Sequence, residues 1–122
     1  MIRGVVERGF AAIIPIVVRG PHGEPQQLSG LIDTGFDGFL TLPPEIIAAL
    51  QLPWLRVERV LLGNGSETTD GVYEVVIEWD GLEFAVEAGE ADTEPLVGMS
   101  MMAGYTIRID NVEGGAVELT RL

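Results

Sequence analysis

The chain has no cysteine and few basic residues, and each shortage excludes a class of protein. Without cysteine, no disulfide, thiol nucleophile or cysteine-based zinc site can form. Seven basic residues stand against nineteen acidic ones, which gives a formal net charge of −12. Nucleic-acid binders need clustered Lys and Arg to neutralise phosphates, so we expect no nucleic-acid partner.

Long hydrophobic runs are also missing. The apolar stretch at 11–18 is too short to span a bilayer. The first four residues lack the charged head, long apolar stretch and cleavage site of a signal peptide. We therefore expect a soluble, cytoplasmic protein with no membrane partner.

The residues that are present predict one domain, 1–122, with a mainly β fold. Nearly half of the chain, 47%, is hydrophobic, which is enough to bury a core. Short β-branched runs alternate with Gly- and Pro-rich turns about every ten residues, which is typical of a closed or sandwiched β-barrel. Strands are predicted at 5–6, 11–18, 27–32, 39–42, 57–62, 72–79, 82–86, 95–98, 105–109 and 116–119.

Few segments of the chain favour helix. The prolines at 43 and 44 predict a helix over 45–50, because proline suits a first helical turn. One or two helical turns are expected in 99–103, and the acidic segment 87–94 is expected to be a loop. The sequence thus predicts one or two short helices beside the sheet.

Asp33 is the strongest candidate for chemistry. It ends an apolar strand and is followed by Thr34 and Gly35. A carboxylate in a partly dry place is costly to ionise, which makes its proton useful in a reaction. An ordinary turn is the alternative, since Asp caps turns and Gly permits positive φ. A calcium loop does not fit, because its third position would be Gly35 and its twelfth Pro44.

Three segments follow one another along the chain. They are Leu31–Asp37, which contains Asp-Thr-Gly, then the turn Gly63–Gly65, and then Leu96–Met99, which contains an apolar-apolar-Gly sequence. In this order they resemble the retropepsin-like aspartic proteases, the family of the retroviral proteases and of small bacterial and archaeal relatives. The first segment is similar to the active-site loop of that family, the second is at the place of the flap hairpin, and the third is similar to the segment beside the active-site loop.

The resemblance implies a small closed β-barrel and a homodimeric aspartic endopeptidase. Pepsin-like chains carry two Asp-Thr-Gly motifs, whereas this chain carries one. Asp33 of one protomer would therefore pair with Asp33 of a second copy and activate a water that hydrolyses the peptide bond. Such an enzyme needs a polypeptide substrate and neither a metal nor an organic cofactor.

The resemblance also implies roles for the residues after Asp33. The hydroxyl of Thr34 would bond across the dimer axis and keep the two loops rigid. Gly35 would leave room for the substrate backbone, and its carbonyl would accept a hydrogen bond from it. Asp37 matches a position near the outer subsites, where it would take backbone N–H groups of the substrate.

The other two segments would cover and support the site. The hairpin tip Gly63, Asn64 and Gly65 would bind substrate by folding over it, since glycine makes such a motion cheap. Val97 and Gly98 would run beside the active-site loop and support it.

Three positions depart from the viral pattern. Met99 replaces a basic residue that pairs with the acid matching Asp37, Gly38 replaces a polar residue, and Asn64 replaces an apolar flap tip. These departures leave a second hypothesis open, which is a non-catalytic peptide-binding or dimerisation module on the same fold.

Overall fold

A computed structural model describes residues 1–61 and 63–122. In this part of the chain the backbone forms strands and one short helix, which are β1 (Ile2–Glu7), β2 (Ala11–Arg19), β3 (Pro25–Ile32), β4 (Leu40–Leu42), α1 (Pro44–Ala49), β5 (Trp54–Leu61), β6 (Glu67–Trp79), β7 (Leu82–Glu90), β8 (Leu96–Val97), β9 (Tyr105–Ile109) and β10 (Ala116–Arg121).

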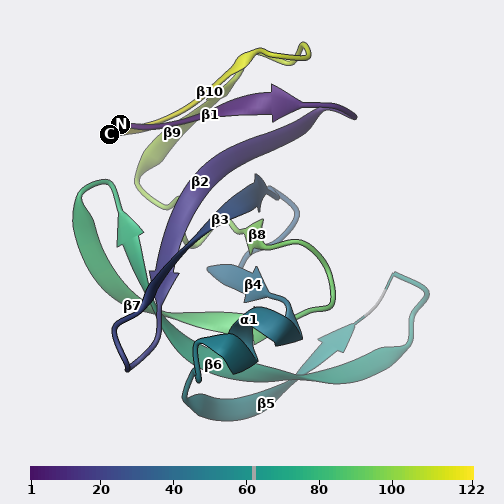
Figure 1. The fold of residues 1–122 in the computed structure, drawn as a ribbon. Helices are drawn as coiled ribbons and strands as arrows, with labels where there is room; N and C mark the ends of the chain where they lie inside the picture. Colours follow the sequence, from purple (N-terminus) through teal and green to yellow (C-terminus); the bar gives the residue numbers. More distant parts are fainter. Residues whose placement is uncertain (62) are drawn as a thin grey trace.

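Six of the strands close into a barrel (Figure 1). Going round, the order is β6, β7, β4, β8, β3 and β2, and the pairing of β2 with β6 closes the ring. Most neighbouring strands run antiparallel, but β3 pairs with β8 and β4 with β7 in parallel. The short strand β8 therefore lies between β3 and β4, which brings 96–97 beside the end of β3.

The terminal strands extend the sheet beyond the barrel. Residues 11–13 at the start of β2 pair with β1, β1 pairs with β10, and β10 pairs with β9. The two chain ends consequently lie side by side (Figure 1). At the opposite end of the sheet, β5 and β6 form a hairpin that projects from the barrel.

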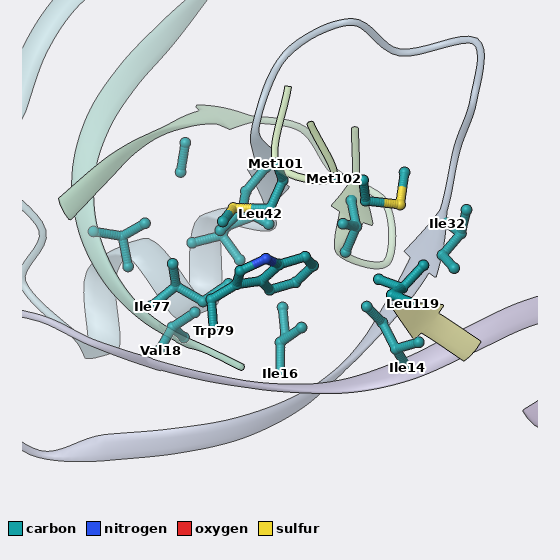
Figure 2. Packing of buried hydrophobic residues seen from close by; sticks show 14 of the residues in the cluster. Ile14, Ile16, Val18, Ile32, Leu42, Ile77, Trp79, Met101, Met102 and Leu119 are labelled. Carbon is teal, nitrogen blue, oxygen red and sulfur yellow. The ribbon is translucent and has the colours of Figure 1, made fainter. Parts of the chain in front are cut away.

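Alternate residues of the strands fill the barrel. In β2, Ile14, Ile16 and Val18 are buried while Pro15 between them is exposed, as period-2 alternation predicts. Trp79 lies among these side chains (Figure 2) and packs edge-on against Tyr105, with ring centroids 6.0 Å apart. Ile14, Ile16, Val18 and Trp79 belong to the hydrophobic core, and Tyr105 packs against it.

The helix α1 packs on the core as its sequence predicts. It starts at Pro44, one residue earlier than expected, and ends at Ala49. Ile47 and the following Leu50 and Leu52 are buried in the hydrophobic core. No helix in the described part of the chain is long and apolar enough to cross a membrane.

The mainly β prediction is confirmed, and two local predictions are wrong. Residues 87–90 belong to β7 and not to a loop, because Ala88 is fully buried and Glu87 is held by an arginine on β5. Residues 99–103 form hydrogen-bonded turns and no regular helix. The strand predicted at 57–62 forms within β5, and its last residue, Leu62, lies outside the described residues.

Candidate active site

Asp33 is placed by the pairing of β3 with β8. Ile32 lies opposite Val97 in this parallel pair, and the Asp33 N–H donates to the Val97 carbonyl over 3.0 Å. The Asp33 carbonyl then accepts the Phe36 N–H over 3.2 Å, which closes a turn over 33–36. The carboxylate therefore stands half-buried at the point where a barrel strand ends.

The backbone of the turn orients the Asp33 carboxylate. Its Oδ1 accepts the Gly35 N–H over 2.9 Å. A Cβ at position 35 would lie 3.3 Å from the same oxygen, which is a tight contact. Gly35 thus leaves the carboxylate room and fixes its direction, while Thr34 between them is exposed.

The segment 98–100 holds the next part of the loop. Met99 N–H donates to the Phe36 carbonyl over 2.8 Å, Gly98 N–H to Phe39 over 2.9 Å and Ser100 N–H to Gly38 over 3.1 Å. The Ser100 hydroxyl donates to the Asp37 carbonyl. Every carbonyl from 36 to 39 is therefore bonded to this one segment.

A cleft of about 510 Å³ opens beside the loop. Its walls come from the loop, β4, the β5–β6 hairpin and β7. Its lining residues are Phe36, Gly38, Phe39, Leu40, Thr41, Glu58, Asp70, Val72, Glu87, Gly89, Glu90 and Ala91. Apolar side chains and four carboxylates thus share the cleft.

Arg56 carries the positive charge of this region. Its guanidinium lies 2.5 Å from a Glu87 oxygen and 2.7 Å from Glu58. Hydrogen bonding to Arg56 lowers the pKa of Glu87, against the raising effect of desolvation. On the neighbouring strand, desolvation and then the Glu90 charge raise the pKa of Tyr73.

A larger cleft, of about 620 Å³, lies elsewhere. It is lined by residues such as Trp79, Phe84 and Tyr105, and only Phe39 lines both clefts. At its edge the Met1 ammonium, the Tyr105 hydroxyl and Arg121 hold the pKa of Asp80 below its usual value. Asp33 lines neither cleft, but the smaller one borders Phe36, Gly38 and Phe39 of the loop that follows Asp33, so the smaller one is the candidate site.

The structure brings together some of the predicted site residues. Val97 and Gly98 are buried directly against the loop 33–39. Asp37 is exposed, and no ion pair to it occurs within residues 1–61 and 63–122. The hydroxyl of Thr34 has no hydrogen-bond partner among the described residues of one protomer.

The predicted hairpin tip lies outside the cleft lining. Gly63, Asn64 and Gly65 line neither the 510 Å³ cleft nor the 620 Å³ cleft. The Asn64 side chain accepts the Ser66 N–H over 3.0 Å and the Ser66 hydroxyl over 2.6 Å. Asn64 therefore stabilises its own turn.

Sequence reasoning missed Phe36, Ser100 and the Arg56–Glu87 pair. The Phe36 ring packs against Gly38 and Gly98, whose added Cβ atoms would each lie 2.6 Å from it. A serine two residues after Gly98 carries no signal of its own in the sequence. Within the described residues, no group of three His, Asp or Glu side chains could hold a metal ion.

Comparison with known proteins identifies the fold. No protein-family model matches the chain, and no curated protein matches its sequence. Among solved structures, the EIAV protease in complex with the inhibitor HBY-793 aligns with a TM-score of 0.57 at 18% identity, covering 78% of this chain and 88% of that one. A retropepsin-like aspartic protease from Rickettsia conorii aligns with a TM-score of 0.55 at 15% identity, covering 98% and 91%. The chain therefore has the retropepsin-like fold.

Proposed function

We propose that the chain is a homodimeric aspartic endopeptidase in which Asp33 of one protomer pairs with Asp33 of a second copy. The observation that carries the proposal is the Asp33 carboxylate, half-buried at the end of β3 and oriented by the Gly35 N–H, on a retropepsin-like fold. Peptide hydrolysis by carboxylates needs a general base and a general acid. One chain supplies one Asp-Thr-Gly loop, so a second copy would supply the other carboxylate across a two-fold axis.

The chemistry follows from the closeness of two carboxylates. At a separation of about 3 Å and an effective dielectric constant of about 20, two full charges would repel by roughly 5 kcal/mol. The pair would therefore hold one proton and titrate as a unit. The ionised carboxylate takes a proton from a water molecule as the water oxygen attacks the scissile carbonyl carbon. The protonated carboxyl group donates its proton to the carbonyl oxygen. The intermediate then transfers a proton to the leaving nitrogen and yields a carboxylic acid and an amine.

The substrate is an extended polypeptide. The cleft runs from the active-site loop to the strands of the β5–β6 hairpin, which contribute Glu58, Asp70 and Val72 to its wall. A hairpin hinged at its base can cover such a chain and exclude water from it. Backbone hydrogen bonds to an extended peptide supply affinity, and pockets for alternate side chains supply specificity.

The second candidate is a non-catalytic peptide-binding or dimerisation module. Two observations favour it, which are the Asp37 carboxylate without an ion pair among the described residues and the Asn64 side chain engaged in its own turn. Such a module would bind peptides in the same cleft and leave them intact.

Replacement of the proposed catalytic carboxylate tests the first candidate. The Asp33→Asn variant keeps the shape of the side chain but removes its acid–base capacity, so cleavage of a diverse peptide pool between about pH 4 and 7 should fall by at least a factor of about one hundred. The melting temperature and the sedimentation behaviour should match those of the parent. The measurement is the rate of product formation by mass spectrometry.

A matched variant controls for the loss of a carboxylate as such. Asp110→Asn changes an exposed residue beyond β9 and should leave cleavage unchanged. Equal rates for the parent and Asp33→Asn would exclude Asp33 as the catalytic group. A parent that binds peptides without cleaving them would favour the binding module.

A further inference from the structure

In the loop 36–39, the backbone carbonyls and the backbone N–H groups point to opposite sides. All four of its carbonyls accept hydrogen bonds from the segment 98–100, three from backbone N–H groups and one from the Ser100 hydroxyl. No cis peptide bond occurs, and in a trans peptide the N–H points away from the C=O. The N–H groups of Asp37, Gly38 and Phe39 therefore point away from the supporting segment.

These three N–H groups lie beside the candidate active site. None of them has a hydrogen-bond partner within the described residues. Gly38 and Phe39 both line the 510 Å³ cleft, where a bound chain would lie. Successive N–H groups with one orientation form a site for carbonyl or carboxylate oxygens.

The peptide between Asp37 and Gly38 has the weakest backbone support. Its neighbours are held by backbone N–H donors, which the chain path fixes, whereas its carbonyl is held only by a side chain. Gly38 adds freedom, because a residue without Cβ can rotate about its φ angle at little cost. The Phe36 ring packs close to that glycine, since a Cβ at position 38 would lie 2.6 Å from two of its ring atoms and would push the ring aside.

We infer that Ser100 is a positioning residue that fixes the Asp37–Gly38 peptide so that the Gly38 N–H donates to a backbone carbonyl of the bound polypeptide. The inference rests on the proposed function. Ser100 touches neither the substrate nor Asp33. Its hydroxyl acts through the Asp37 carbonyl, and its loss leaves the peptide free to turn its N–H away from the cleft.

Substitution of Ser100 should separate binding from chemistry. In Ser100→Ala, KM for a cleaved peptide should rise about three- to tenfold, which is the worth of one hydrogen bond, while kcat stays within about twofold of the parent. Ser100→Thr keeps a hydroxyl and should restore KM. Ser29→Ala removes an exposed serine on β3 and should change neither constant.

A set of modified peptides tests the stated contact itself. Each peptide replaces one backbone carbonyl with a methylene group, position by position, and its affinity is measured on the non-cleaving Asp33→Asn protein. The peptide modified at one particular position should bind the Asp33→Asn protein more weakly than the unmodified peptide does. On the Asp33→Asn, Ser100→Ala double variant, the same modification should cost no affinity. A merely structural role of Ser100 would lower affinity for all peptides by the same factor.

The outcomes distinguish the inference from the proposed function. An unchanged KM in Ser100→Ala, or an equal loss for every modified peptide, would overturn the inference and leave the protease proposal standing. A parent that neither cleaves nor binds any peptide would overturn both. Selective loss at one carbonyl position, with rescue by threonine, is the result that we expect.

Discussion

At the residue scale, Gly98 shows how closely the segment 98–100 approaches the loop 36–39. A Cβ at this position would lie 2.1 Å from the Gly38 carbonyl oxygen and 2.6 Å from the Phe36 ring. The oxygen belongs to the backbone and to a carbonyl that Ser100 also binds, so it has little freedom to move. The glycine is therefore required for the contact that holds 36–39 in place.

Gly98→Ala should destabilise the fold by about 3 kcal/mol or more, because overpacking against backbone cannot be relieved by a rotamer change. The free energy of unfolding from urea denaturation measures the effect. Gly89→Ala on β7 is the matched control, since nothing lies within 4 Å of its added Cβ. A similar, small effect of both substitutions would show that the contact at Gly98 is not close.

Sequence reasoning reached some of these residues and not others. It placed Asp33 at the end of a strand, because a strand end is a local feature of a sequence, whereas only the family resemblance placed Val97–Gly98 beside it. The bond from Ser100 to Asp37 joins residues 63 positions apart and depends on a particular side-chain direction. The direction of Asn64 toward Ser66 is likewise a matter of turn geometry that composition does not specify.

At the element scale, an ion-pair cluster crosses the β5–β6 hairpin. Arg56 and Glu58 lie on β5 and Glu87 on β7, with β6 between the two strands. On β6, Glu74 lies directly opposite Glu87. Arg56 thus joins β5, the first strand of the hairpin, to the barrel strand β7. Its positive charge also offsets the repulsion between Glu74 and Glu87.

The pKa of Glu87 gives this cluster a pH dependence. Because that pKa is lowered by Arg56 in the folded protein, the stabilisation is present above the ordinary value of 4.5 and is lost as the pH falls through the lower folded value. Glu87→Gln should lower the melting temperature by no more than a few degrees at neutral pH, since the groups are exposed. The difference from the parent should shrink as the pH falls below 4.5 and vanish once Glu87 is protonated in the folded protein.

Glu74→Gln provides the contrast for this prediction. It removes a like charge opposite Glu87 and should leave the melting temperature equal or slightly higher at neutral pH. A constant difference between Glu87→Gln and the parent at all pH values would show that the ion pair does not cause the effect.

The same cluster explains why one element was mispredicted. The acidic composition of 87–94 indicates a loop, yet its first four residues extend β7. Ala88 points into the core and Glu87 finds its counter-charge on β5, two strands away. Composition reports the charges of a segment, whereas pairing with distant strands decides its structure.

At the scale of the whole molecule, pairing of the terminal strands within one chain limits which strand edges are available for pairing with a second copy. β1 lies between β2 and β10, and β10 lies between β1 and β9, so both terminal strands are paired on each side within one chain. Repeated short strands predicted the barrel, but the pairing order that closes it between β2 and β6 depends on contacts far apart in the sequence. The proposed dimer is a property of two copies, and no feature of one chain fixes its geometry.

The most direct test of the paired Asp33 carboxylates is a mixing experiment. The parent is held at a fixed concentration, equilibrated with a ninefold excess of Asp33→Asn, and assayed for peptide cleavage, with an unrelated acidic protein as the control addition. If each site needs Asp33 from two copies, most parent chains enter dead heterodimers and the rate falls about tenfold. A rate that does not change with added Asp33→Asn, at any ratio and after full exchange of protomers, would contradict the account.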